Sequence, residues 1–474
     1  MLTFFISIIL LLAGYFAYSR IVERIFVIQP DRKTPAYTHA DGVDYVPMSW
    51  HRIFLIQFLN IAGLGPIFGA IMGAMYGHAA FLWIVFGTIF GGAVHDYFSG
   101  MLSLRNNGMS LPEIVGKYMG VGFKQFMRAF TVLLMVLVGA VFVAGPSALL
   151  AKMTSGYMGA TMWSIIIFVY YIGATLLPID KLIGKIYPFF GFAILFMALG
   201  IAVSMIWNGL AMPEMSLSNL RNMHPDAEHY PLFPMLFISI ACGAISGFHA
   251  TQSPMMARCL KNERQGRRVF YGAMVAEGIV ALIWAAAAIS FFGSTGGLQE
   301  FLRDNGNNAA VVVDKIAHSW LGKFGGLLAI IGVIAAPITS GDTAFRSARL
   351  IVADFINYSQ KSIVNRIIVS MPLFIVALGI LQINFDVIWR YFAWSNQTLA
   401  TATLWTVTVY LAKSGKFYWL TLLPSLFMTM VISTYIMVAP EGLGLSTNIG
   451  YFVGTVCTFV SLAMFIRWKN KIDN

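Results

Sequence analysis

Four polar residues lie close together inside one apolar stretch of this chain. Asp342 has Thr339, Ser340 and Thr343 beside it in the sequence APITSGDT. Hydroxyl oxygens next to a carboxylate can coordinate Na⁺, and the carboxylate by itself can bind a proton. The alternative is a helix-end carboxylate paired with Arg346, one helical turn further along. We predict that these four residues form an ion-coupling site, with H⁺ favoured and Na⁺ as the alternative.

His95 and Asp96 are a second pair of ionisable residues in an apolar stretch. Histidine titrates near neutral pH, so a buried His–carboxylate pair can relay protons. The alternative is an interfacial pair that anchors a helix end beside Arg105. His249 and Glu277 are also ionisable residues in apolar stretches, and for Glu277 ion pairing and a transport role remain equally open. We therefore add His95 and Asp96 to the predicted ion-coupling residues.

Two apolar stretches contain residues that interrupt helices. The first reads IAGLGP at 61–66, and the second is interrupted by Gly243, Gly247 and Pro254. Proline lacks an N–H group and disfavours helical geometry in the residue before it, while glycine lets the backbone unwind. Unwound backbone at membrane depth persists only where protein, water or a ligand satisfies its polar groups. A tolerated kink or a small-residue packing face is the alternative.

Neutral polar side chains near these interruptions could hydrogen-bond a ligand. A third apolar stretch begins with Trp389 and Arg390, and Arg390 either extends to the membrane interface or steers an anionic substrate. The predicted substrate-binding residues are Gly63, Gly65, Pro66, Gln57, Asn60, Gly247, His249, Thr251, Asn396 and Gln397.

The composition requires most of this chain to lie in a lipid bilayer. Of 474 residues, 58% are hydrophobic and 11% are charged, whereas a soluble domain has about 25% charged residues. The short alternating segments of a membrane β-barrel are missing, which favours a helical bundle. The apolar stretches predict thirteen transmembrane helices, near 2–19, 53–76, 79–103, 129–151, 160–178, 186–207, 233–257, 269–292, 325–345, 367–383, 389–412, 418–438 and 448–466.

The distribution of positive charge predicts the orientation. With the N-terminus outside, 25 of the 31 Lys and Arg residues fall on the cytoplasmic side, as the positive-inside rule requires. The net charge of +11 is therefore typical of a membrane protein with basic cytoplasmic loops, and we expect no nucleic-acid partner. The N-terminus has no basic segment and no clear cleavage site, so we interpret it as a retained first helix. The C-terminus is predicted to be cytoplasmic.

The two interrupted stretches are the second and seventh predicted helices, five helices apart. Transporters of the LeuT type contain two inverted repeats and broken helices around the substrate. We predict one transmembrane domain over 1–474, in which helices 2 to 11 form a LeuT-like 5+5 inverted-repeat core at 53–412. Residues 1–52 then provide an extra helix and a cytoplasmic loop, and residues 413–474 provide two accessory helices.

Motifs for enzymatic chemistry are missing from the sequence. It contains no HExxH, GxSxG or Walker motif, and Cys242, Cys259 and Cys457 have no metal-ligand spacing. We expect neither an enzyme nor a bound metal or other cofactor, apart from the coupling ion.

Several long motifs resemble the carbon-starvation protein A (CstA) family of bacterial membrane transporters. They are DRKTPAYTHADGVDYVP at 31–47, IAGLGPIFG at 61–69, GGAVHDYFSG at 91–100, RNNGMSLPEIV at 105–115, LFISIACGAISGFHA at 236–250, TSGDTAFRSAR at 339–349 and WRYFAWSNQTLA at 389–400. The resemblance implies a LeuT-like transporter of the amino acid–polyamine–organocation superfamily. It also implies uptake of peptides or pyruvate during nutrient limitation, by proton symport. Better-known members are longer, and many carry paired histidines where this chain has Ile56-Gln57-Phe58.

We therefore predict a secondary transporter in the bacterial inner membrane. Its leading substrate is pyruvate or a similar small carboxylate, taken up with H⁺. The alternatives are a peptide transporter of the same fold and a membrane sensor that binds a nutrient without moving it. The expected partners are the small-molecule substrate and the lipid bilayer, and the oligomeric state is left open.

Overall fold

A computed structural model describes residues 1–154, 157–176, 183–212, 214–383 and 385–473 of the chain. The regular structure of these residues is helical throughout. The first half contains α1 (Leu2–Ala13), η1 (Gly14–Tyr18), α2 (Ser19–Phe26), α3 (Pro35–Thr38), α4 (Trp50–Ala62), η2 (Gly65–Gly69), α5 (Ala70–Ala74), α6 (Ala79–Leu82), η3 (Trp83–Gly92), α7 (Ala93–Arg105), α8 (Leu111–Met119), α9 (Val121–Met153), α10 (Ala160–Leu176), α11 (Ile183–Trp207) and η4 (Leu217–Asn219).

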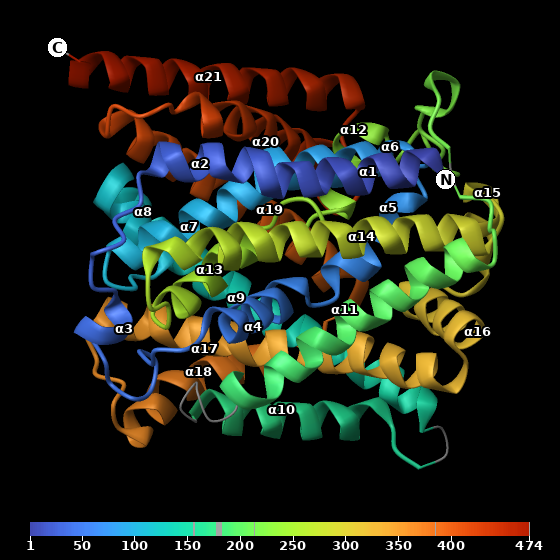
Figure 1. Ribbon diagram of the computed structural model, residues 1–474, viewed down its shortest axis with the longest axis horizontal. Coiled ribbons are helices and arrows are strands. Elements are labelled where there is room, and N and C mark those ends of the chain that lie inside the picture. The colour runs from blue at the N-terminus through green and yellow to red at the C-terminus, as the bar shows by residue number, and fades with distance from the viewer. Residues whose placement is uncertain (155–156, 177–182, 213, 384, 474) are drawn as a thin grey trace.

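The second half continues the bundle. It contains α12 (Leu232–Ser239), α13 (Gly247–Ala257), η5 (Glu263–Gln265), η6 (Arg267–Tyr271), α14 (Gly272–Phe291), α15 (Thr295–Asp304), α16 (Ala309–Ile330), η7 (Ile331–Ala335), α17 (Ala336–Ile356), α18 (Ile363–Ile380), α19 (Phe385–Lys413), α20 (Trp419–Val438) and α21 (Thr447–Asp473). Figure 1 shows that the axes of most long helices are roughly aligned, and that the two chain termini lie at opposite ends of the bundle.

Burial separates a central helix from a peripheral one. In the span that contains α14, 83% of the most apolar window is buried, against 17% in α21. The central helix α14 packs on α4, α5, η2, η3 and α11, whereas α21 packs mainly on α20. Large apolar side chains such as Phe452, Phe459 and Met464 are exposed on α21. Such a surface is suited to lipid, which agrees with a multi-pass membrane protein.

Eight helices of the described chain are long and apolar enough to cross a membrane, or nine when a bent pair is one span. The predicted number of thirteen is therefore not established by length and composition. Some predicted spans fall short because they are broken or brief: α12 has 8 residues, α13 has 11 and α10 has 17. Thirteen transmembrane helices remain a prediction.

The first break lies where the sequence predicts it. Helix α4 ends at Ala62, and the chain bends by 53° before continuing as η2 and α5. Gly63 has φ +40° and ψ −133°, a backbone conformation that residues with a Cβ rarely adopt. Pro66 then occupies the start of the next helical segment, where its missing N–H costs nothing.

The second break lies slightly before its predicted position. Helix α12 ends at Ser239 and α13 begins at Gly247, so residues 240–246 form the unwound connection. Pro254 lies inside α13 without ending it. The stretch from Gly247 to Thr251 is consequently the first turn of a helix. Of the expected interrupting residues, Gly243 lies in the connection and Gly247 marks its end.

Candidate functional site

The two broken helices touch each other. A Cβ added to Gly65 would lie 2.1 Å from Cys242 Cβ, so only glycine allows the two segments to come so close. A Cβ added to Gly243 would likewise lie 3.8 Å from Pro66 Cα. Residues almost 180 positions apart in the sequence therefore form one crossing of unwound backbone. This crossing is the centre of the candidate site.

Polar side chains of α19 hold the second break. Gln397 Nε2 donates a hydrogen bond to the Ile245 carbonyl at 3.0 Å. Asn396 Oδ1 accepts hydrogen bonds from the Phe248 N–H at 2.6 Å and the Ser246 hydroxyl at 3.1 Å. Buried backbone groups need such partners, because an unpaired one costs about 1–3 kcal/mol. In this conformation Asn396 and Gln397 thus stabilise the unwound connection itself, and their binding of substrate remains a prediction.

Glycine is required where α13 meets α19. A Cβ added to Gly247 would lie 2.3 Å from the Asn396 carbonyl oxygen and 2.5 Å from the Ala400 nitrogen. A larger residue would push the two backbones apart. The contact keeps the Phe248 N–H within reach of Asn396, which explains why α13 begins at this point.

A cavity of about 200 Å³ reaches the crossing of the two breaks. Gly65 and Cys242 lie at the crossing, and Arg390, His224 and Glu441 line other parts of the cavity. Among the predicted substrate-binding residues within the described ranges, only Gly65 lines it. The Nε atom of Arg390 is buried, with no hydrogen-bond partner among the described residues. A guanidinium with unused donors at a cavity wall is suited to a carboxylate ligand.

Gln57 and Asn60 lie on α4 just before the first break, and both are fully buried. Gln57 Nε2 donates to the Ser253 hydroxyl of α13 at 3.3 Å, which links the two broken helices. Both amide atoms of Asn60 have no hydrogen-bond partner among the described residues. Thr251 donates to the Phe248 carbonyl of its own helix at 2.7 Å. Of these three predicted residues, Asn60 has the most unused hydrogen-bonding capacity.

A continuous row of buried ionisable side chains crosses α7, α13 and α14. Asp96 contacts His95 Nδ1 at 2.8 Å with one carboxylate oxygen and His249 Nδ1 at 2.9 Å with the other. The second ring nitrogen of His249, Nε2, lies 3.4 Å from a carboxylate oxygen of Glu277. All four side chains are fully buried. The structure therefore joins two predicted coupling residues, one predicted substrate residue and Glu277 into one network.

Close helix packing brings this network together. A Cβ added to Gly92, immediately before α7, would lie 2.2 Å from the Ala244 carbonyl oxygen in the second break. A Cβ added to Gly278 on α14 would lie 2.6 Å from Thr88 Oγ1. Glycine at both positions allows α7 and α14 to approach the connection, so that Asp96 and Glu277 reach His249 from two sides.

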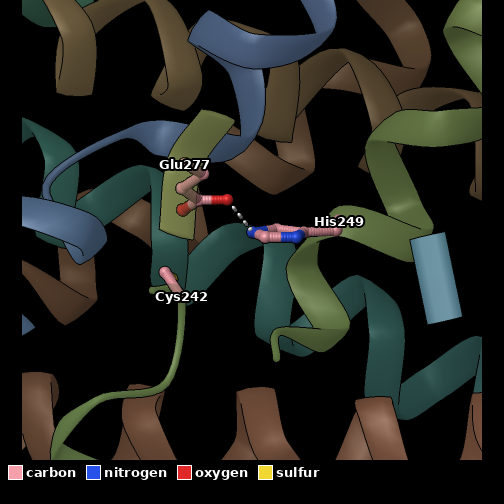
Figure 2. Close-up of side chains that lie close together, drawn as sticks. All are labelled: Cys242, His249 and Glu277. Atoms are coloured by element: carbon pink, nitrogen blue, oxygen red, sulfur yellow. Dashed lines mark ion pairs between the residues drawn. The ribbon is translucent and has the colours of Figure 1, made fainter. Parts of the chain in front are cut away.

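Figure 2 shows His249 and Glu277 facing each other, with Cys242 close by. Their possible ligand atoms lie within 4.8 Å of one another, and these residue types can bind transition metals. Ligand atoms around a tetrahedral Zn²⁺ are about 3.3–3.8 Å apart, given metal–ligand bonds of about 2.0–2.3 Å. The 3.4 Å separation of His249 Nε2 and the Glu277 carboxylate falls within this range, and it also allows a direct interaction between an imidazole and a carboxyl group. We describe this contact as an acid–base pair.

Asp342 occupies a separate polar site between α17, α10 and α11. The Tyr187 hydroxyl donates a hydrogen bond to one carboxylate oxygen, and Thr175 Oγ1 lies 3.5 Å from the other. Arg346, the alternative partner expected from the sequence, reaches Asp44 at 3.4 Å and the Ala174 carbonyl at 2.7 Å. Hydroxyl groups therefore hydrogen-bond the Asp342 carboxyl, with the charge of Arg346 nearby, and the coupling role of Asp342 remains a prediction.

The hydroxyl groups beside Asp342 face different partners. Thr339 and Thr343 donate to carbonyl oxygens of their own helix, at 2.7 Å for Ala336 and 3.0 Å for Ser340. Ser340 instead donates to the Leu59 carbonyl at 3.2 Å, near the first break. Ser340 thus connects the Asp342 cluster to α4, the first broken helix.

The opposite end of the bundle contains a buried ionic cluster. Asp44, in the loop before α4, lies 3.4 Å from Arg346 and 3.7 Å from Arg349 on α17. Arg258, just after α13, donates to the Gly108 carbonyl at 2.9 Å. Burial would raise the pKa of Asp44, but Arg349 and Arg346 outweigh it and hold the pKa below its usual range. The loop around Asp44 is therefore fastened to α17 by charge.

Sequence reasoning missed three residues that the structure brings to these sites. Cys242 lacks metal-ligand spacing in the sequence, and its position in the second break gives no local sign of its neighbours His249 and Glu277. Tyr187 has no local signal, because its partner Asp342 is 155 positions away. Asp44 is inside the motif at 31–47, but nothing local identifies Arg346 and Arg349 as its partners.

Comparisons with known proteins agree with this architecture. The family model described as "Carbon starvation protein CstA" matches residues 1–162, 143–319 and 290–435. An uncharacterized membrane protein of Haemophilus influenzae is 44% identical over 348 residues, covering 63% of this chain and 94% of that protein.

Two named relatives are more distant. The pyruvate/proton symporter BtsT of Escherichia coli is 28% identical over 344 residues, covering 60% of this chain and 48% of that protein. The peptide transporter CstA of Campylobacter jejuni is 27% identical over 556 residues, covering 89% of this chain and 78% of that protein.

Among solved structures, MhsT in complex with L-phenylalanine matches with a TM-score of 0.55 at 14% identity, covering 88% of this chain and 98% of that chain. At this identity the match shows a shared fold, the LeuT fold, and carries no information about the ligand.

Proposed function

This chain belongs to the carbon starvation protein CstA family, and we propose that it is a secondary-active transporter that takes up a small carboxylate together with H⁺. Membrane transport is the function that its named relatives share. Pyruvate or a similar small carboxylate is the proposed substrate. The observation that carries this choice is the cavity at the crossing of the two broken helices, with Arg390 in its wall.

The size of this cavity and the arginine in its wall support a small anionic substrate, while the carboxylate in the wall, Glu441, accepts a hydrogen bond from the Tyr435 hydroxyl. Its volume of about 200 Å³ is below the roughly 300–1,000 Å³ of sites for drug-sized ligands. Arg390 supplies a guanidinium that can bind a carboxylate with two parallel hydrogen bonds. The first turn of α13 lies beside the crossing, and a helix N-terminus favours negative charge.

Peptides are the second candidate substrate. Four residues of this cavity, Met72, Met75, His224 and Tyr230, also line a neighbouring cavity of about 580 Å³. A peptide could place its terminal carboxylate near Arg390 and its remaining residues in the larger space. Competition of labelled pyruvate uptake by dialanine or trialanine distinguishes the two substrates, since only a peptide site gives strong inhibition by the peptides.

We further propose that the membrane is the bacterial inner membrane, with the N-terminus outside. In this orientation the Arg390 cavity belongs to the outer half of the protein and the Asp44 cluster to the cytoplasmic half. The positive charges described above support this direction. The substrate would enter from the Arg390 side and leave past the loop that contains Asp44.

The central experiment is uptake of labelled pyruvate into proteoliposomes under an imposed inward proton gradient, with and without Na⁺. We expect accumulation that depends on the proton gradient and is indifferent to Na⁺. Arg390→Gln should reduce uptake at low substrate concentration at least tenfold by raising KM, because a charge-assisted hydrogen bond contributes about 1.5–3 kcal/mol. Arg221→Gln is the matched control, since Arg221 is exposed and lines neither cavity.

The outcomes separate transport from sensing. A sensor would bind pyruvate without accumulation or counterflow in any gradient. Absence of pyruvate uptake by folded protein would remove pyruvate from the proposal, and an unchanged KM in Arg390→Gln would remove Arg390 from the site.

We also propose that Asp342 links ion binding to closure of the bundle. It contacts α10 and α11 through Thr175 and Tyr187, while its neighbour Ser340 contacts the first break at Leu59. We expect Asp342→Asn to slow both accumulation and counterflow, because closure contributes to every transport cycle. Full accumulation by Asp342→Asn would show that this role is wrong.

A further inference from the structure

Glu277 is an unusual acid for the centre of a membrane bundle. It lies on α14, the central helix, and its side chain is fully buried. Neither of its carboxylate oxygens has a hydrogen-bond partner among the described residues. An ionised carboxylate in such surroundings is costly without a partner of opposite charge. Glu277 is therefore stable either as a neutral acid or beside a protonated His249.

The side chains around Glu277 allow one proton to move between its carboxyl group and His249. His249 faces it from α13, with Nε2 at 3.4 Å, and Asp96 acts on it from α7. Cys242 approaches from the connection before α13. From η3, Thr88 Oγ1 approaches α14 at Gly278 and is uncharged. Among the described residues, the ionisable groups placed near Glu277 are thus an imidazole, a second carboxylate and a thiol.

The other side of His249 is held in a fixed orientation. Its Nδ1 contacts Asp96 at 2.9 Å, and the second oxygen of Asp96 contacts His95 Nδ1 at 2.8 Å. When the Nδ1 proton donates to Asp96, Nε2 faces Glu277 and can accept or hold one proton. Asp96 and His95 consequently position His249 for exchange with Glu277.

The pair adjoins the second break, and through Cys242 it adjoins the cavity. Cys242 belongs both to the cavity wall and to the group around Glu277 and His249. His249 is on the first turn of α13, directly after the unwound residues 240–246. A movement of α13 about this connection would separate His249 from Glu277, while α14 remains enclosed by its neighbours. Loss of that contact would leave an ionised Glu277 without its partner.

We propose that Glu277, paired with His249, is the binding site of the coupling proton, and that His95 and Asp96 are positioning residues for it. This inference rests on the proposed proton-coupled transport. In the loaded state one proton is shared between the Glu277 carboxyl group and His249 Nε2. In the unloaded state that proton has left to the opposite side, and no other bond is formed or broken.

The test measures two reactions in the same proteoliposomes. Proton-driven accumulation of labelled pyruvate requires proton release, whereas counterflow exchanges internal for external pyruvate without net proton movement. Glu277→Gln is neutral like the protonated acid, so the loaded carrier can still exchange substrate. We expect Glu277→Gln to lose accumulation at least tenfold and to retain counterflow within about twofold, with little dependence on pH. Glu228→Gln, at an exposed position, is the matched control.

The outcomes distinguish this inference from the proposed function. Failure of the wild-type protein in both assays would contradict proton-coupled pyruvate transport itself. Wild-type transport together with normal accumulation by Glu277→Gln would overturn the assignment of Glu277. Loss of counterflow by folded Glu277→Gln would also overturn it, because the residue would then serve structure or substrate binding.

The positioning residues have their own readout. Asp96→Asn removes the negative charge beside His249 but keeps the size of the side chain. We expect it to retain counterflow and to shift the pH profile of counterflow toward lower pH, because His249 holds a proton less strongly. Asp96→Glu should restore part of the profile. An unchanged profile in Asp96→Asn would limit Asp96 to a structural role.

Discussion

The two ends of this bundle differ in what lies between the surface and the crossing of the broken helices. At the Arg390 end a cavity extends to Gly65 and Cys242. At the other end the loop containing Asp44 is fastened to Arg346 and Arg349 on α17. The first end contains a cavity that leads to the crossing, and the second holds buried ion pairs. We therefore expect that opening the Asp44 end would require the separation of buried ion pairs, whereas the Arg390 end would need no such step.

Asp44→Asn should have the largest effect on this difference. It removes the negative charge that Arg346 and Arg349 share, and breaking a buried ion pair costs about 3–5 kcal/mol. The Cys259 thiol lies 3.8 Å from the Asp44 carbonyl, and burial raises the pKa of this thiol to about 12. We expect maleimide labelling of Cys259 to accelerate about 100-fold or more in a variant that lacks the other two cysteines, since about 1.4 kcal/mol corresponds to tenfold.

Two controls accompany the Asp44 variant. Asp31→Asn removes an exposed carboxylate from the same segment and should leave labelling unchanged. Asp44→Glu keeps the charge and should keep most of the protection. Slow labelling of Cys259 in folded Asp44→Asn would contradict a closure based on charge.

At the Arg390 end, substrate should protect Cys242 from thiol labelling, and this effect should be smaller than that of Asp44→Asn on Cys259. Cys242 lines the cavity and is 6% exposed, so a membrane-impermeant thiosulfonate reagent should reach it slowly from outside. We expect saturating pyruvate to slow this labelling about fivefold, as bound ligand occupies the cavity and shifts the protein toward one conformation. Cys457 on α21, kept alone in a second variant, should label at the same rate with and without pyruvate. Equal labelling of Cys242 under both conditions would place the substrate elsewhere.

Mild acid should have the smallest effect on the loop that contains Asp44. Arg349 and Arg346 outweigh the opposing effect of burial and hold the pKa of Asp44 below its ordinary value of 3.8. A carboxyl group with a lowered pKa contributes stability above its ordinary pKa and loses it only as the pH falls through the lowered value. Hydrogen exchange of residues 39–49, corrected for the intrinsic rate, should therefore be unchanged between about pH 7 and pH 5. Faster exchange at about pH 5 would show that another group controls the loop.

Much of the architecture follows from local sequence patterns. The glycines and proline at 61–66 predict the first break, and the structure has a 53° bend there. The second break covers Gly243 and ends at Gly247, but Pro254 does not interrupt α13, which starts where Asn396 Oδ1 accepts hydrogen bonds from the Phe248 N–H and the Ser246 hydroxyl. A local pattern identifies where a helix can unwind, but distant partners decide which backbone groups remain unpaired.

Several residues of the candidate site could be predicted from the sequence, but most of the contacts between them could not. His95, Asp96 and His249 are conspicuous as ionisable residues in apolar stretches. Their contacts with one another and with Glu277 could not be predicted from the sequence, since 153 positions separate Asp96 from His249. The same holds for Asp342, whose local neighbour Arg346 pairs with Asp44 in the structure.

The sequence by itself determined that this is a helical membrane protein of a recognisable family with two interrupted helices. Composition, glycine and proline positions and long motifs are properties of the chain that need no folding to be read. The tertiary structure decided which charges meet, because in a low-dielectric interior every buried carboxylate must find a hydrogen-bond donor, a cation or a proton. Asp44 is matched with arginines, Asp342 with hydroxyl groups and Glu277 with a histidine, and we base the three different proposed roles of these carboxyl groups on that difference.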